Sequence, residues 1–257
     1  MDLKKEENLR ISYQSMGIRD FSQYTLIKYP PPYYLIDQII MKGTVSILGG
    51  VPGIGKSIIA LSIIKSLLTG EPLWGRFQVF ETGPVILVDE ENPAHLLSER
   101  LQLIGIEENL SLHLLFSQGV RLDEESYFDA FMWKLEEVKP ILVVIDSLIR
   151  VHRQNENDNT EMARVIEQIR RIANWGTTVL LIHHYKKGET PLIERFRGAS
   201  EIIAGVDIQY ALIRTRYSYL IFKSVKTRTV PLPPIKLRFE ISNKKIEIIS
   251  EDEMENE

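Results

Sequence analysis

The sequence predicts an α/β protein built on a mostly parallel, doubly wound sheet. Between residues 44 and 183, short apolar runs typical of buried strands alternate with segments whose apolar residues recur at helical spacing. After about residue 205, strand follows strand, which predicts an antiparallel extension of the sheet. With 257 residues and 44% hydrophobic content, the chain is large enough to bury this core as one domain.

The predicted elements follow one another in a regular order. The parallel strands are expected at 44–49, 84–89, 112–117, 141–146 and 178–183. The helices between them are expected at 55–69, 93–105, 124–138 and 161–175. The antiparallel strands are expected at 207–214, 217–225, 235–241 and 244–249. Glycine, proline or polar residues separate these elements, as turn chemistry requires.

The two ends of the chain differ from its middle. The run Tyr29-Pro30-Pro31-Pro32-Tyr33 predicts an extended connector, because consecutive prolines cannot continue a helix. We therefore expect residues 1–40 to form an N-terminal arm or strap and residues 41–250 to form the main domain. Residues 251–257 are mostly acidic, which predicts a solvated, disordered tail.

Composition excludes several classes of protein. The chain has no cysteine, which excludes disulfides, thiolate metal sites and cysteine nucleophiles. No apolar run approaches the roughly 20 residues of a membrane span, and the charged N-terminus is unlike a secretory signal, so we expect a cytoplasmic protein. The net charge of −4 argues against nucleic-acid binding through a global positive field, although a local basic surface would be compatible with it.

The first predicted strand leads into a phosphate-binding loop. The run Gly50-Val51-Pro52-Gly53-Ile54-Gly55-Lys56-Ser57 matches the pattern G-x-x-x-x-G-K-[ST] between a strand and a helix. The glycines allow backbone N–H groups to face phosphate oxygens at the helix N-terminus. We expect Lys56 to contact the β and γ phosphates of ATP and Ser57 to ligate Mg²⁺, with the nucleotide-binding segment extending to Ile58. The alternative is a glycine-rich turn without nucleotide.

Two further apolar strands end in carboxylates at the same predicted edge of the sheet. Asp146 follows the run at 141–145, where ligands bind in open α/β sheets, and we expect it to hold Mg²⁺, often through water. Its alternative role is a turn or helix-cap aspartate. The strand at 84–89 leads into Asp89-Glu90-Glu91, and one of these acids is a credible general base. For Asp89 and Glu90 we expect the simpler role of capping the next helix.

Several short motifs between about Pro30 and Phe239 carry a family resemblance. They are Leu73-Trp74-Gly75-Arg76-Phe77, Glu91-Asn92-Pro93, Arg100-Leu101, Asp146-Ser147, His183-His184-Tyr185-Lys186, Arg197-Gly198-Ala199-Ser200 and Lys226-Thr227-Arg228. With these motifs in this order and at this spacing, the chain resembles the RecA-fold P-loop ATPases. It looks closest to the RepA-like plasmid replicative helicases, which are related to DnaB, RadA and KaiC. The resemblance implies a RecA-like P-loop core.

The resemblance also implies roles for individual residues. It makes Glu91 the catalytic base and places His183 and His184 where the γ-phosphate is sensed, with His184 preferred. Without the resemblance, both histidines would be buried core residues or metal ligands. Arg100 is expected either to reach phosphate or to be a solvated helical arginine. The candidates for a finger inserted into a neighbouring subunit's site are Arg197, Lys226 and Arg228; the last two otherwise form a surface charge ladder.

The function implied by the resemblance is Mg-ATP hydrolysis coupled to movement of a hexameric ring on single-stranded DNA. The loops expected to line the channel are 153–160, which is poor in cations, and 186–195, which offers Lys186, Lys187 and Arg195. One alternative is a regulatory or recombination-mediator ATPase in the manner of RadA paralogues or KaiC, without unwinding activity. Another is a nucleotide-gated scaffold that does not hydrolyse ATP and in which Glu91 is idle.

Overall fold

A computed structural model describes residues 33–185, 200–215, 219–242 and 245–251. Most of the predicted N-terminal arm and acidic tail lies outside these residues. The chain divides after Pro31, and the residues that follow form one unit. That boundary lies closer to the N-terminus than the predicted limit at residue 40.

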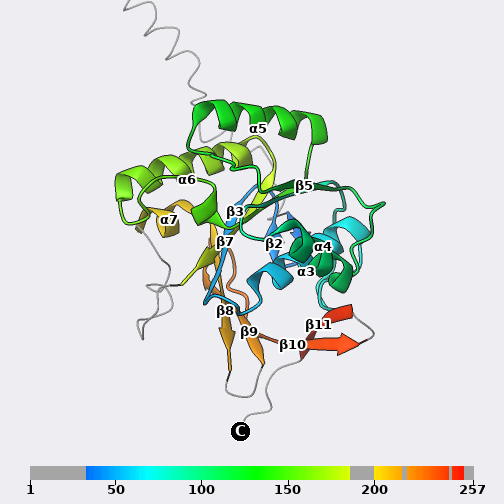
Figure 1. Ribbon diagram of the computed structural model, residues 1–257. Coiled ribbons are helices and arrows are strands. Elements are labelled where there is room, and N and C mark those ends of the chain that lie inside the picture. Colours follow the sequence, from blue (N-terminus) through cyan, green and yellow to red (C-terminus); the bar gives the residue numbers. More distant parts are fainter. Residues whose placement is uncertain (1–32, 186–199, 216–218, 243–244, 252–257) are drawn as a thin grey trace, which may run out of the picture. The chain divides into compact units, whose positions relative to one another are not determined.

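One sheet of nine strands organises the described residues, in the order β11-β10-β9-β8-β3-β7-β6-β4-β5 (Figure 1). The parallel strands are β3 (Val45–Gly50), β4 (Val85–Asp89), β5 (Leu112–Phe116), β6 (Leu142–Asp146), β7 (Thr178–His184) and β8 (Ile208–Arg214). The antiparallel strands are β9 (Leu220–Lys226), β10 (Ile235–Ser242) and β11 (Lys245–Glu251). This arrangement confirms the predicted fold, a RecA-like P-loop core with an antiparallel extension.

Helices cover both faces of the parallel strands. The helices are α3 (Lys56–Thr69), α4 (Ala94–Ile104), α5 (Glu125–Val138), α6 (Asn159–Asn174) and α7 (Ser200–Gly205), with a short 3₁₀ helix, η1 (Leu148–Arg150). Buried residues of α3 and α4 share one hydrophobic core, and those of α5 and α6 share the other. Among the described residues, no helix is both long enough and apolar enough to cross a membrane.

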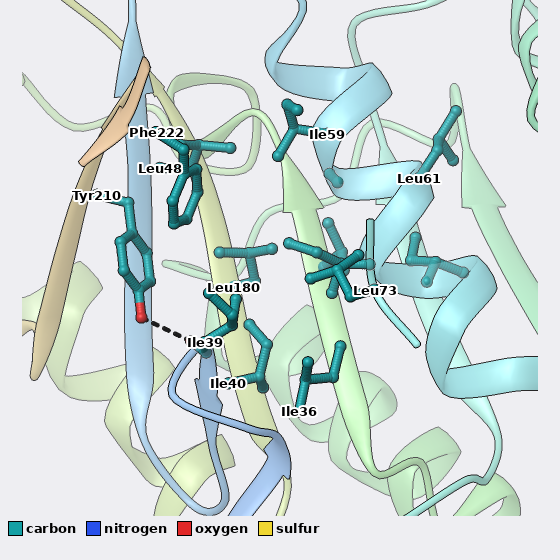
Figure 2. Close-up of a cluster of buried hydrophobic side chains, with 14 of the residues drawn as sticks. Ile36, Ile39, Ile40, Leu48, Ile59, Leu61, Leu73, Leu180, Tyr210 and Phe222 are labelled. Carbon is teal, nitrogen blue, oxygen red and sulfur yellow. Dashed lines mark hydrogen bonds between the residues drawn. The ribbon is translucent and has the colours of Figure 1, made fainter. Parts of the chain in front are cut away.

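The core beneath α3 also contains residues that the sequence placed in the arm. A small antiparallel pair, β1 (Tyr34–Ile36) and β2 (Ile40–Met41), buries four aliphatic side chains there together with the turn that joins the two strands. Figure 2 shows Ile36, Ile39 and Ile40 beside Leu180, with the Tyr210 hydroxyl donating to the Ile39 carbonyl at 2.6 Å. Residues 34–41 are therefore part of the folded domain, because their apolar side chains need a core to enter.

The predicted and observed elements agree closely, with three differences. Helix α6 begins at Asn159, two residues early, because the Asp158 carboxylate accepts the N–H groups of Thr160 and Glu161. The strand expected at 217–225 begins at Leu220. The short elements β1, β2, η1 and α7 were not predicted. All six parallel strands point the same way, so the residues that follow β3, β4, β6 and β7 meet at one edge of the sheet.

Candidate functional site

The strand order brings the predicted site residues to the carboxyl edge of the parallel strands. Strand β7 lies between β3 and β6, and its register pairs His184 with Gly50. Strands β4 and β6 pair Asp89 with Asp146. Asp89 and Asp146 lie two positions after Leu87 and Val144, which belong to the core beneath α3 and α4, so their side chains point to the face that those helices cover.

The loop after β3 has a backbone that requires glycine. Gly53 and Gly55 have φ angles of 73° and 109°, in the left-handed region that other residues rarely adopt. A Cβ atom on Gly55 would also lie 3.1 Å from the ring of Phe239 in β10. The N-terminus of α3 has no side-chain cap and no acidic residue in its first turn. Its N–H groups therefore remain available to an anion.

Hydrophobic residues of the loop fix its position on the domain. Ile54 is almost completely buried in the first core, and Ile58 packs against the same core. Val51, in contrast, is 46% exposed. Within the loop, the apolar side chains therefore divide into anchors at Ile54 and Ile58 and an exposed tip at Val51 and the neighbouring Pro52.

The Lys56 side chain folds back over the loop. Its ammonium group donates to the carbonyl oxygens of Gly50 and Val51, both at 3.1 Å, and lies 3.2 Å from His184 Nδ1. The side chain is buried, and this desolvation lowers the pKa of Lys56. Lys56 thus occupies a position from which it can exchange carbonyl partners for phosphate oxygens.

His184 connects Lys56 to Glu91. Its Nε2 lies 3.3 Å from Glu91 Oε2, on the other side of the ring from Lys56. Because an ammonium group can only donate, Nδ1 accepts from Lys56 and Nε2–H donates to Glu91, which fits a neutral imidazole. The hydrogen bond from His184 outweighs partial burial and lowers the pKa of Glu91 to about 2. Glu91 is therefore ionised at neutral pH.

The structure does not bring His183 into this cluster. Side chains alternate along a strand, so His183 lies on the opposite face of β7 from His184. It is buried, with Nδ1 4.0 Å from Glu156 Oε1. Of the two histidines predicted to sense the γ-phosphate, only His184 contacts Lys56 and Glu91; its role as a sensor stays a prediction.

Ser57 and Asp146 form the part of the site suited to a metal ion. Asp146 is 4% exposed; burial raises its pKa to about 6, and the adjacent Ser57 hydroxyl offsets part of the increase. A cavity of about 10 Å³ lies beside them, lined also by Asp89, Leu97 and Arg100.

This donor set fits Mg²⁺. Carboxylate and hydroxyl oxygens suit a hard cation, and Mg²⁺ is usually held by one or two such ligands plus phosphates and water. The described residues contain no cluster of three or more histidine, aspartate or glutamate side chains arranged for a metal. A magnesium ion bound together with nucleotide does not require one.

Asp89 and Glu90 do not cap α4, contrary to the prediction. That helix begins at Ala94 with Pro93 as its N-cap, and no side chain caps it. Asp89 instead accepts the N–H groups of Glu91 and Asn92, at 3.0 and 2.9 Å. Glu90 accepts three N–H groups from residues 118–120, in the loop after β5. Both acids lie too far before the helix to reach its first turn.

Arg100 points toward the cavity and not into solvent. Its Nη1 donates to Asn92 Oδ1 at 2.7 Å, and the Asn92 amide in turn donates to both carboxylate oxygens of Asp89. Arg100, Asn92 and Asp89 thus form a chain of hydrogen bonds around the turn that presents Glu91. Asn92 belongs to the Glu91-Asn92-Pro93 motif, but no role for its own side chain was predicted from the sequence.

Two of the three predicted finger residues, Lys226 and Arg228, lie at the opposite edge of the sheet. Lys226 Nζ donates to the carbonyls of Ile203 and Val206, at 2.7 and 2.8 Å, around the end of α7. Arg228 Nε lies 3.1 Å from Asp207 Oδ1. The other oxygen of Asp207 accepts the N–H of Val45, the first residue of β3.

Because the phosphate-binding loop follows the last residue of β3, a full strand separates Arg228 from its own loop, about 20 Å for six residues. Neither Lys226 nor Arg228 can serve the site of its own chain. Arg197, the third candidate, lies outside the described residues, as do Lys186, Lys187 and Arg195 of the second predicted DNA loop.

The first predicted DNA loop, 153–160, is held by contacts of its own. The Asn155 N–H donates to Glu161 Oε2, and Asp158 caps α6. Arg153 lies 3.7 Å from Glu124. The only cation in this loop is thus close to a carboxylate of the same chain.

A comparison with protein families gives one match. The family described as an AAA domain matches residues 19–190, more than half of the chain. The matched range contains the phosphate-binding loop, Glu91, Asp146 and His184, and it ends before β8.

Proposed function

Since the chain belongs to the AAA domain family, a family of P-loop ATPases, we propose that it is a ring-forming motor that couples Mg-ATP hydrolysis to movement on single-stranded DNA. ATP hydrolysis in general is supported by the family. The helicase activity, the ring and the DNA substrate are the proposal.

One observation carries the hydrolytic part: Lys56, His184 and Glu91 form a continuous chain of contacts beside Ser57 and Asp146. In the proposed reaction, Lys56 leaves the carbonyls of its own loop for the β and γ phosphates. His184 then loses its contact with Lys56. Through its hydrogen bond to Glu91, His184 passes this change on to Glu91 when the γ-phosphate binds.

Glu91 orients the attacking water and accepts its proton. A carboxylate with a pKa of about 2 is a weak base, so its release from the His184 hydrogen bond would raise its basicity. Ser57 and Asp146 would hold Mg²⁺, which supplies positive charge to offset the charge on the phosphates. In the absence of nucleotide, Lys56 and Glu91 are both held by their contacts with His184.

A second copy of the chain would complete the site. The amino edge of one copy would face the carboxyl edge of the next, and a head-to-tail contact of this kind closes into a ring when its rotation permits. Arg228 suits the finger role better than Lys226, because its side chain is 58% exposed while Lys226 is bound by helix carbonyls. Such a cation can contribute about 10³ to 10⁵ in rate.

The main alternative is a regulatory ATPase that hydrolyses ATP without unwinding DNA. The contacts within loop 153–160 favour it, since a loop rich in acids and amides offers little attraction to phosphates. The cations that would support DNA binding lie outside the described residues.

The test is steady-state ATP hydrolysis with and without a long single-stranded oligonucleotide, with Lys56→Ala as the blank. Stimulation by DNA that disappears in the blank supports the motor. Hydrolysis that does not respond to DNA supports the regulatory ATPase. If the wild-type rate equals that of the blank, the proposal of ATP hydrolysis fails.

A further inference from the structure

We propose that Asp89 is a second carboxylate of the metal site, which acts together with Asp146 to set the affinity for the divalent cation that accompanies the nucleotide. The inference rests on the proposed function and extends it. Asp89 would be a positioning residue for the cation, distinct from the base Glu91 and from the ligands Ser57 and Asp146.

The position of Asp89 is the first argument. It is paired in register with Asp146 on the neighbouring strand, and strands of a sheet lie about 4.8 Å apart. Both side chains are buried, Asp89 at 2% and Asp146 at 4% exposure. Both line the same small cavity, together with Ser57 at the start of α3. A cation held by Ser57 and Asp146 would therefore lie close to Asp89.

The charge of Asp89 is the second argument. The hydrogen bonds that the structure gives its carboxylate come from neutral donors, the N–H groups of Glu91 and Asn92 and the amide of Asn92. Arg100, the cation beside the cavity, donates to the far side of Asn92. A buried carboxylate whose hydrogen-bond donors are all neutral is costly, and a divalent cation in the cavity would offset this cost for Asp89 and Asp146 together.

The turn alone does not explain an acid at this position. Asp89 Oδ1 accepts two backbone N–H groups, and an asparagine side chain can accept the same pair without burying a charge. The Asn92 amide also donates to Oδ2, so the local fold uses both oxygens of Asp89 as acceptors, but all of these donors are neutral.

The expected size of the effect follows from the behaviour of other magnesium sites. Mg²⁺ usually keeps several water ligands, so a nearby carboxylate can act on the ion without replacing one of them. Removing such outer partners typically lowers metal affinity about 10- to 100-fold.

The experiment is a Mg²⁺ titration of the binding of a fluorescent ADP analogue, followed by fluorescence anisotropy, which needs no turnover. Asp89→Asn keeps the turn and removes the charge, so we expect at least about a 10-fold increase in the half-saturating Mg²⁺ concentration. The control variant Glu90→Gln leaves the carboxylate of Asp89 in place. It removes the adjacent charge, which faces residues 118–120, and should resemble the wild type.

The outcomes separate the inference from the proposed function. If the wild type binds the analogue in a Mg²⁺-dependent way and Asp89→Asn has the same dependence, the inference is overturned and the proposed function stands. If the wild type binds no nucleotide at any Mg²⁺ concentration, both fail. Should Asp89→Asn not fold, Asp146→Asn takes its place: it should retain Mg²⁺-dependent binding at higher concentration, and complete loss of that dependence would overturn the inference.

Discussion

The two edges of the parallel strands contain buried aspartates in opposite electrostatic situations. At the amino edge, Asp207 contacts Arg170 and Arg228, at 2.9 and 3.1 Å, and also accepts the N–H of Val45. At the carboxyl edge, Asp89 has neutral hydrogen-bond donors, and Asp146 is buried beside a serine hydroxyl.

The comparison of the two edges separates two kinds of charged residue. Those at the amino edge stabilise the fold, and those at the carboxyl edge can bind a ligand. The network around Asp207 joins β3, β8, α6 and the segment after β9, and two arginines of the same chain compensate the charge of its carboxylate. The carboxyl edge has an excess of negative charge next to a cavity. Changes at the amino edge should therefore affect stability, and changes at the carboxyl edge should affect activity.

The largest expected effect is on turnover, from Glu91→Gln. The substitution removes the proposed base and keeps the size of the side chain, so kcat for ATP hydrolysis should fall about 10²- to 10⁴-fold. Nucleotide binding and the thermal unfolding midpoint should change little. A coupled ATPase assay measures the rate, with Glu90→Gln as the matched control. Unchanged turnover in Glu91→Gln would remove Glu91 from the base role.

The next effect is on stability, from Asp207→Ala at the amino edge. This change leaves Arg170 with its charge unpaired and the N–H of Val45 without an acceptor, and should lower the free energy of unfolding by about 2 to 4 kcal/mol. Arg228→Ala removes only a largely exposed partner of the same carboxylate, so its cost should stay below about 1 kcal/mol. Urea denaturation measures both. Equal losses in the two variants would contradict the idea that Asp207 is the centre of this network.

The smallest effect should have the opposite sign. Because the pKa of Asp146 is raised from 3.8 to about 6, the native state binds a proton between these values that the unfolded state releases. The stability contributed by protonated Asp146 is therefore lost as the pH rises through this range. Asp146→Asn should stabilise the nucleotide-free protein by about 1 to 3 kcal/mol at pH 7.

Thermal unfolding at pH 7 and pH 4, without nucleotide and Mg²⁺, tests this prediction. At pH 4 the advantage of Asp146→Asn should largely disappear, because Asp146 is then protonated in the wild type as well. Lower stability of the variant at pH 7 would mean that the charge of Asp146 is compensated within the chain, as the charge of Asp207 is.

Much of the fold could be predicted from the sequence, because its parallel strands are continuous apolar runs such as 142–145. The short elements were missed because strands of two or three residues and helices of three to six residues are too short to show a hydrophobic period. Local patterns also could not reveal the contact of His184 with Lys56, which depends on β7 lying beside β3. Among three adjacent acids, local sequence favoured capping for Asp89 and Glu90, although the helix start after Pro93 leaves them too far away.

The packing of Phe239 on Gly55 determines when, during synthesis of the chain, the phosphate-binding loop acquires all of its contacts. The two residues are more than 180 positions apart in the chain. At about 5 to 20 residues per second, their synthesis is separated by roughly 10 to 40 s. Throughout that interval a nascent chain contains its phosphate-binding loop but not the aromatic ring that packs against it. The loop is thus among the first parts of the domain to be translated and among the last to acquire its complete surroundings.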